Sequence, residues 1–256
     1  MVKDRKRIEK EKLSEARGQL VVKRNDLIQK SRHRMDLQEQ KIILYMISKI
    51  KPNDKNFTEQ IFSIAEFCRV CGLDDDNGGN YAYIKKTLQS IRDKSIWVEL
   101  EEGVETTLAW INKVNFEYRS GLVKLELDND MKPFLLELKE NFTQFELVYT
   151  LGMRSQYSVR LYELLKSYQY KKHVKFDIDE LKKLLFAESK AYSRGNNFKQ
   201  KVLDIATNEI NKLTDILITY ELLRVGRKFA EVEFRITQKN TGERINAWSN
   251  ISEVLD

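Results

Sequence analysis

Apolar residues recur at helical spacing in several segments, and the clearest of these segments runs from residue 196 to residue 213. Its apolar positions form one stripe, whose members are Phe198, Val202, Ile205, Ala206, Ile210 and Leu213. The opposite face is polar and holds Asn197, Gln200, Lys201, Asp204 and Asn208. This pattern predicts an amphipathic helix whose apolar stripe packs on a core.

A shorter helix is predicted just before the long one. Residues 176–180 indicate a strand that enters a helix running from Ile178 to about Phe186. Asp177 can accept the free N–H groups of the first turn, and Glu180 can reach back to the N–H group of the capping residue. The sequence therefore predicts a reciprocal capping box at this helix start.

Two alternating segments follow the long helix. Apolar residues alternate through 216–220, a turn is indicated at Gly226, and the alternation returns through 232–236. A helix, a second helix and a hairpin, in that order, are typical of a winged helix. This fold is a helix-turn-helix variant whose second helix can lie in a DNA major groove.

The same arrangement occurs earlier in the chain. A shift of 114 positions places residues 62–66 on residues 176–180, and it places a second apolar triplet on the long helical stripe. That triplet is Ile84, Leu88 and Ile91, which falls on Phe198, Val202 and Ile205. Matching apolar stripes at a fixed offset indicate an internal duplication.

Helix caps support the earlier copy. Asp36 and Glu39 predict a capping box that opens an apolar helix over residues 37–50, and Ser63 and Glu66 predict another. The helix after Ser63 is expected to end near Gly72. A second long apolar helix, over residues 159–168, precedes the later copy in the same way.

These patterns predict an α+β fold made of two tandem winged-helix domains related by internal duplication. The expected organisation is a basic N-terminal arm over residues 1–20, an N-terminal winged helix over 21–130, a C-terminal winged helix over 131–240 and a C-terminal tail over 241–256, with the linker near 128–133.

Net charge is a weak guide to function in this chain. The formal charge is +6, but residues 1–24 hold nine of the 45 basic and four of the 39 acidic residues, so the rest carries only +1. A basic arm could follow a DNA backbone or be a solvated terminus. The local placement of charge must therefore carry the argument.

Two stretches of the later copy are basic and free of acidic residues. They are residues 191–201, at the start of the long helix, and residues 222–230, at the hairpin tip. The candidate DNA-binding residues here are Arg194, Asn196, Asn197, Lys199, Gln200, Lys201, Arg224, Arg227 and Lys228. Each cluster alone would suit a solvated surface, but both lie where a winged helix meets a duplex, which favours DNA binding.

The earlier copy differs at the same places. Its second helix offers Lys85, Lys86 and Arg92 for phosphate contact, but its hairpin over residues 97–105 carries four glutamates, which phosphates would repel. We therefore predict that this wing points away from DNA. Trp97 and Trp110 are expected in the core, together with Val114 and Phe116. The extra strands near residues 121–127 would pack there too or serve a partner subunit.

Several ordered motifs resemble the replication initiator (Rep) proteins of iteron-containing plasmids. The resemblance covers about residues 20 to 238 and is clearest in the later copy. Its motifs are residues 157–165 (YSVRLYELL), residues 176–181 (FDIDEL), Tyr192, Phe198-Lys199, residues 208–211 (NEIN) and residues 214–216 (TDI).

The resemblance implies a protein that binds directly repeated origin sequences in double-stranded DNA and recruits the host replication initiator and helicase machinery. It implies that the N-terminal half of the second recognition helix reads bases, which falls on Asn197, Lys199, Gln200 and Lys201 with Arg194 just ahead. It also implies that the first domain supplies backbone contacts and a homodimer interface, that dimers repress, and that monomers initiate. Autoregulation of its own gene is a further expectation.

Enzymatic chemistry is not expected, and neither a cofactor nor a metal is predicted. His33 and His173 lie far apart, so the metal-binding histidine pair of a rolling-circle initiator is lacking, as is a phosphate-binding loop. Cys68 and Cys71 have C-x-x-C spacing without a second pair, which favours buried helix thiols.

Three further residues leave alternatives open. Arg160 could contact phosphate, or it could pair with a carboxylate such as Glu163 or Glu209. Tyr162 and Tyr192 are more typical of core aromatics than of base-stacking platforms.

No apolar run is long enough to span a membrane, and the charged N-terminus has no signal region, so a cytoplasmic protein is expected. A winged-helix transcriptional regulator without an initiation role is the alternative function.

Overall fold

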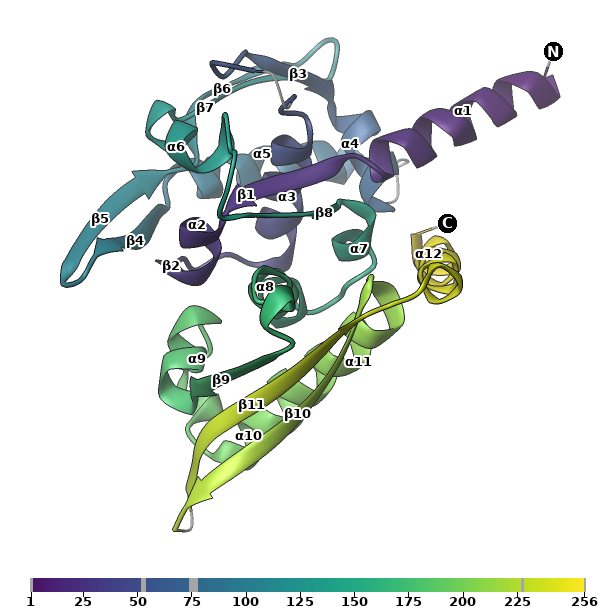
Figure 1. The fold of residues 1–256 in the computed structure, drawn as a ribbon. Coiled ribbons are helices and arrows are strands. Elements are labelled where there is room, and N and C mark those ends of the chain that lie inside the picture. The colour runs from purple at the N-terminus through teal and green to yellow at the C-terminus, as the bar shows by residue number, and fades with distance from the viewer. Residues whose placement is uncertain (1, 52–53, 74–77, 227, 256) are drawn as a thin grey trace.

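The computed structural model describes residues 2–51, 54–73, 78–226 and 228–255. Two winged-helix units lie on opposite sides of one central helix, α8 (Gln156–Ser167) (Figure 1). We call residues 20–151 the first unit and residues 173–238 the second unit. The predicted tandem winged-helix fold is confirmed.

The first unit is preceded by a projecting helix and contains helices and strands in alternation. The preceding helix is α1 (Val2–Arg17). The elements of the unit are β1 (Leu20–Arg24), α2 (Asn25–Gln29), β2 (Ser31–Arg32), α3 (Leu37–Ser48), β3 (Gln60–Ser63), α4 (Ile64–Cys71), α5 (Gly78–Arg92), β4 (Ser95–Glu101), β5 (Val104–Ala109), β6 (Ile111–Glu117), β7 (Leu122–Leu127), α6 (Lys132–Leu135), β8 (Phe142–Glu146) and α7 (Val148–Leu151).

The second unit follows α8 and is itself followed by a helix. Its elements are β9 (His173–Asp177), α9 (Ile178–Leu184), α10 (Gly195–Phe198), the π-helical turn η4 (Lys199–Leu203), α11 (Asp204–Leu213), β10 (Ile216–Val225) and β11 (Lys228–Gln238), after which comes α12 (Thr241–Leu255). The predicted hairpin is present as the antiparallel pair β10–β11.

The two copies differ in how their sheets are assembled. In the second unit, β9 pairs with β11, so strand and wing form one sheet in the order β10-β11-β9. In the first unit, β3 pairs with β7 instead, in the order β3-β7-β6, and the wing pairs with β2, in the order β2-β4-β5. Val123 and Leu125 of β7 are buried, so one strand of the extra pair lies in the core of its own unit.

Helix caps explain why α3, α4 and α9 begin where they do. Asp36 and Glu39 form the predicted reciprocal box at α3. Ser63 accepts a hydrogen bond from the Glu66 N–H group, but the predicted return contact is wrong. The Glu66 carboxylate accepts instead from the Tyr45 hydroxyl at 2.8 Å and from Lys49 at 3.1 Å, because α3 lies beside it.

The predicted capping box of α9 is confirmed for the half that Asp177 forms. The Asp177 carboxylate accepts hydrogen bonds from the N–H groups of Asp179 and Glu180 at 2.8 and 3.0 Å. The αL residue Gly72 ends α4 as predicted, with φ of 65°. The caps read from the sequence thus locate both short helices that precede the recognition helices.

The central helix α8 is buried on every side. It packs against α2, α3 and β8 of the first unit and against α11 of the second. Its buried polar residues are Ser158, Arg160, Tyr162, Glu163 and Ser167. A buried polar group without a partner is costly, and Arg160, Tyr162 and Glu163 find their partners in the two units. The Ser158 hydroxyl is the exception, since it has no hydrogen-bond partner among the described residues.

Arg160 joins the two units through backbone carbonyl groups. Its guanidinium donates to the carbonyl oxygens of Ile28 at 2.7 Å and Ser31 at 2.8 Å in the first unit, and to that of Leu184 at 3.2 Å in the second. Both sequence interpretations of Arg160 are therefore wrong. Glu163 forms an ion pair with Lys23 rather than with Arg160, and a phosphate cannot reach a side chain buried in this way.

The Glu209 carboxylate also has other partners. It accepts from the N–H groups of Arg154 and Ser155, which precede α8. Tyr162 is a core aromatic as predicted, and Tyr192 is half-buried against Tyr157 with ring centroids 5.6 Å apart.

The tryptophans of the first unit have different environments. Trp110 is buried, as predicted, where the chain bends between β5 and β6. Trp97 is 49% exposed, so its assignment to the core is wrong. Alternation explains this: Ile96 and Val98 on β4 point into the core, and the side chain between them points outward.

Chain segments on both sides of the predicted boundary near residue 130 contact each other. Strand β1 pairs with β8, from Leu20 opposite Glu146 to Arg24 opposite Phe142. The segment predicted as a linker contains the buried residue Met131 and leads into α6. One continuous core cluster includes buried residues from both units.

Both terminal helices pack on the folded units, although α1 projects from the molecule for most of its length (Figure 1). Arg17, at the end of α1, donates to the Val70 carbonyl oxygen at 3.0 Å. At the other terminus, α12 packs on α7 and α11, Trp248 donates to Glu146 at 2.9 Å, and Leu255 lies against Gly72. The predicted C-terminal tail is thus helical.

Replacing Arg160 with methionine should destabilise the protein by about 3 kcal/mol or more, because three carbonyl groups would lose their buried donor. The change should appear as a lower urea midpoint with an unchanged m value. The control is Arg154→Met, whose side chain is exposed just before α8 and whose replacement should cost no more than about 0.5 kcal/mol. A loss below about 1 kcal/mol for Arg160→Met would contradict the bridging role.

Candidate nucleic-acid interface

The recognition helix of the second unit is continuous but not regular. It consists of α10, the π-helical turn η4 and α11, and the N–H group of Asp204 donates to the Lys199 carbonyl oxygen five residues earlier. A π turn holds one extra residue and so rotates the next part of the helix about its axis. This rotation buries Leu203 and leaves Ile205 43% exposed, which corrects the predicted apolar stripe at Ile205.

The start of this helix packs directly against the wing. A Cβ atom added at Gly195 would lie 2.7 Å from Cδ2 of Phe229 on β11, so the ring occupies the space that a side chain would need. The guanidinium of Arg224 on β10 lies over the same ring, 4.5 Å from its centroid. This contact brings the two basic clusters predicted from the sequence to one end of the second unit.

The second half of the recognition helix is tied to the edge strand of the sheet. The Asn211 amide accepts from the Ile218 N–H group at 2.7 Å and donates to the Ile218 carbonyl oxygen at 2.9 Å, as a neighbouring strand would. Asp204 accepts from the Tyr220 hydroxyl on β10. Since β10 lies at the edge of its sheet, the helix satisfies part of an edge that would otherwise be open.

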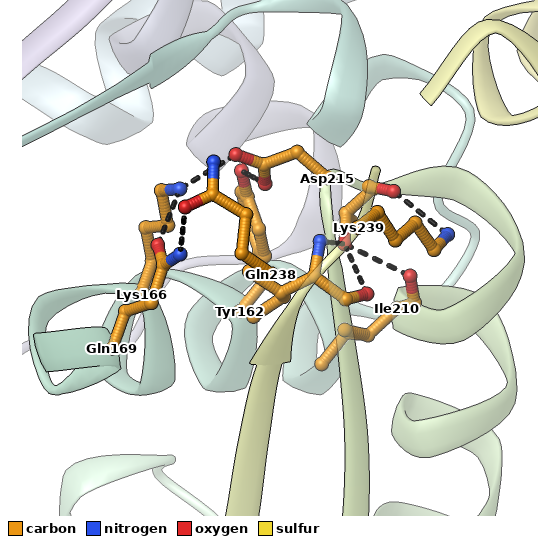
Figure 2. A network of polar contacts seen from close by, with 9 residues as sticks. Tyr162, Lys166, Gln169, Ile210, Asp215, Gln238 and Lys239 are labelled. Atoms are coloured by element: carbon orange, nitrogen blue, oxygen red, sulfur yellow. Dashed lines mark hydrogen bonds and ion pairs between the residues drawn. The ribbon is translucent and has the colours of Figure 1, made fainter. Parts of the chain in front are cut away.

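A polar network holds the base of the hairpin and the end of the helix on α8 (Figure 2). Asp215, just before β10, accepts from Tyr162 at 2.8 Å and from Lys166 at 2.6 Å. Lys239, just after β11, donates to the carbonyl oxygens of Asn211 at 2.5 Å and Thr214 at 2.8 Å, which are orphan acceptors at the end of α11. Burial, with Asp215 beside it, raises the pKa of Tyr162 well above its ordinary value, so the hydroxyl keeps its proton.

The structure places most of the predicted recognition-helix residues on the surface. Arg194, Asn196, Gln200 and Lys201 are exposed, and no ion pair holds Arg194 or Lys201 to another described residue. Asn197 is half-buried and donates to the Ala191 carbonyl oxygen at 3.1 Å.

Lys199 differs from these residues. Its ammonium group donates to both carboxylate oxygens of Asp204, at 2.8 and 3.0 Å. A lysine predicted to face DNA is thus paired with an acidic residue of its own helix.

The wing tip carries exposed cations. Arg224 and Lys228 are exposed, while Arg227 lies outside the described residues. Two acidic residues of the hairpin form ion pairs away from the tip: Glu231 with Lys175 at 3.3 Å and Glu221 with Arg235 at 3.9 Å. The tip therefore presents positive charge without a nearby carboxylate in its own segment.

The candidate DNA-binding residues of the first unit are only partly available for contact with DNA. Lys85 donates to the Tyr118 hydroxyl at 2.7 Å and lies 4.9 Å from the centroid of that ring. That hydrogen bond raises the pKa of Lys85, so its charge is retained. Lys86 and Arg92 are exposed on α5, and the glutamates of the β4–β5 hairpin face solvent at positions 101, 102 and 105.

Sequence reasoning missed the residues that position the recognition helix. Gly195, Phe229, Asn211 and Tyr220 act through contacts between helix and hairpin, and their importance depends on the register between these elements. A glycine at the start of a basic helix was the one signal present, because a close approach often requires glycine there.

The described part of the chain holds no cluster of metal-binding side chains and no helix long and apolar enough to cross a membrane. Cys68 and Cys71 are buried thiols outside any disulfide bond, as predicted, and burial raises the pKa of Cys71 to about 12.

Two winged helices in tandem, with exposed cations at the recognition helix and wing of the second, define a DNA-binding protein of the tandem winged-helix class. Two family models match the chain: "Initiator Replication protein, WH1" over residues 20–166 and "Initiator Rep protein, WH2" over residues 177–236. The first alone spans more than half of the chain. The protein therefore belongs to this family of replication initiators, which confirms the resemblance seen in the sequence and agrees with a non-enzymatic role.

A solved structure shares this architecture. The Pi initiator protein, crystallised in complex with iteron DNA, is similar over 88% of this chain and 99% of its own, with a TM-score of 0.70 and 19% identity. Domains 2 and 3 of RctB match less well in two crystal structures, with TM-scores of 0.44 and 0.45 and 11% identity; they cover 70% and 82% of this chain and 73% and 83% of theirs.

Replacing Gly195 with alanine should destabilise the second unit by about 1 to 3 kcal/mol, because the added methyl group overpacks against Phe229. Thermal or urea unfolding measures this change. Gly79→Ala is the matched control, since nothing lies within 4 Å of a Cβ atom at that position of α5. An equal stability for both variants would mean that wing and helix do not pack as described.

Proposed function

We propose that this protein is a sequence-specific initiator of plasmid replication that binds direct repeats in double-stranded origin DNA through its second unit. The observation that carries the proposal is the packing of Gly195 on Phe229 under Arg224. It places the exposed cations of the recognition helix beside those of the wing, as contact with one groove and its flanking phosphates requires.

The side chains divide by chemistry into base-reading and backbone-binding groups. Arg194, Asn196, Asn197, Gln200 and Lys201 carry amide or cationic ends, which match the donor and acceptor pattern of purine edges in the major groove. Arg224, Arg227 and Lys228 are proposed to bind phosphates, which fix register without reading sequence.

The first unit is proposed to add phosphate contacts through α5. Lys86 and Arg92 are exposed there, and Lys85 is held by Tyr118. The β4–β5 wing is proposed to stay off the DNA, because its exposed glutamates would face phosphate charges of the same sign.

Iteron DNA is proposed as the target because the Pi initiator, which shares this architecture, is described in complex with it. We further propose a homodimer in equilibrium with a monomer, recruitment of the host replication initiator and helicase machinery, and repression of the protein's own gene. The family membership supports these proposals. A winged-helix transcriptional regulator remains the second candidate, since the same surface would serve it.

Lys201→Ala and Arg194→Ala should each weaken binding to the repeat by about 1 to 3 kcal/mol, the worth of a base-edge contact. Electrophoretic mobility shifts at several salt concentrations, with the dimer fraction measured in the same samples, give these values. The control is Lys139→Ala, an exposed lysine before β8, which should bind as the unaltered protein does. Losses near zero for both test variants would contradict the assigned reading helix.

Replication in cells separates the two candidate functions. A plasmid that carries the repeats and no other origin should persist when this protein is supplied from a second plasmid, and Lys201→Ala should abolish its maintenance. Repression of a reporter by the unaltered protein, without plasmid maintenance, would favour the regulator instead.

A further inference from the structure

The ion pair between Lys199 and Asp204 joins side chains that do not meet on a regular helix. Residues five apart on an α-helix point about 140° away from each other, since the helix has 3.6 residues per turn. Neighbours on one face are three or four apart. Here the π turn, closed by the Asp204 N–H group on the Lys199 carbonyl oxygen, brings the two side chains together. The turn and the ion pair therefore depend on each other.

Asp204 is also tied to the wing. It accepts a hydrogen bond from the Tyr220 hydroxyl on β10, and the Lys199 ammonium lies 6.0 Å from the centroid of the Tyr220 ring. Desolvation alone would raise the pKa of Asp204, but hydrogen bonds from Lys199 and Tyr220 outweigh it and lower the pKa. The carboxylate is thus ionised at neutral pH and holds both partners.

We propose that Lys199, Asp204 and Tyr220 form a positioning cluster that fixes the π turn, and that Lys199 is engaged within the protein and does not contact DNA. This inference rests on the proposed function, because it assigns roles within the same recognition helix. Lys201 remains the DNA-binding lysine of the turn.

The cluster sets the rotation of the part of the helix that faces DNA. In a regular helix the stripe through Phe198 and Val202 would continue through Ile205, whereas here Leu203 is buried and Ile205 is exposed. Releasing the π turn would change the angle between the side chains before the turn and the buried face after it. The cluster also keeps one lysine from the sequence-independent attraction of phosphates, which favours specific over non-specific binding.

Salt dependence distinguishes a positioning lysine from a phosphate-binding one. Each phosphate contact contributes about 0.9 to the slope of log affinity against log salt concentration. Lys228→Ala, at the wing tip, should make the slope shallower by about 0.9, whereas Lys199→Ala should leave it unchanged. Lys199→Ala should instead lower affinity for the repeat about five- to tenfold, with non-specific affinity unaltered, because only base contacts need the exact rotation of the helix.

Variants of the other two cluster members complete the test. Tyr220→Phe keeps the ring against Phe234 and removes only the hydroxyl group, so it should reduce the ratio of specific to non-specific affinity without changing the slope. Asp204→Ala should reduce the same ratio and steepen the slope by up to about 0.9, since the released lysine can reach a phosphate. Lys199→Arg, which can keep the ion pair, should retain the ratio. An equal loss of slope for Lys199→Ala and Lys228→Ala would overturn the inference.

A measurement without DNA makes the inference independent of the proposed function. Amide hydrogen exchange at residues 203–205 should accelerate about tenfold or more in Lys199→Ala, because the turn opens more readily, and should not change in Lys201→Ala. Unchanged exchange in Lys199→Ala would overturn the cluster. If the unaltered protein failed to prefer repeat DNA, the proposed function would fail, while the exchange experiment would still decide the cluster.

Discussion

The structure depends on one constraint, which is that α8 is buried on every side and yet carries polar and charged side chains. Buried charges are tolerated only with partners, and no single unit supplies all of them. Arg160 donates hydrogen bonds to carbonyl oxygens of both units. Tyr162 and Lys166 bind the Asp215 carboxylate of the second unit, and Glu163 forms an ion pair with Lys23 of the first. The two winged helices are therefore joined by buried hydrogen bonds and ion pairs as well as by apolar packing.

This constraint reaches the recognition helix through the base of the hairpin. Asp215 and Lys239 connect α8 to the end of α11, Asn211 and Tyr220 connect α11 to β10, and Phe229 connects the wing to the start of the helix. The helix is thus held at its end, middle and start. A surface that must match a groove to within a fraction of an ångström benefits from such support, because each held side chain loses less freedom on binding.

Local and periodic features were predictable from the sequence, and features that depend on contacts between elements were not. The duplication, the Asp36 cap and the hairpin at Gly226 follow from spacing and turn chemistry, which act within a few residues. Ile205 was misplaced because a π turn breaks the period that the prediction assumed. The predicted return contact of Glu66 in the Ser63 capping box was wrong, because Tyr45, 21 residues away in sequence, donates to its carboxylate instead.

The candidate site shows the same division. Exposed cations such as Arg194 and Lys201 could be recognised from a stretch without acidic residues, since charge placement is visible in the sequence. The partner of Lys199 could not be recognised, because Asp204 lies five positions away, a spacing that ordinary helix geometry does not bring together. Trp97 on β4 shows the same dependence in a strand. Ile96 and Val98 on either side of it face the core, so alternation along the strand points Trp97 outward.

The end of α12 has a practical consequence for anyone who handles this chain. The backbone and side chain of Leu255 lie within 3 Å of where a Cβ atom would stand on Gly72, and Gly72 adopts a φ of 65° that other residues rarely accept. A side chain introduced at Gly72 would therefore disturb a packed junction between distant parts of the fold.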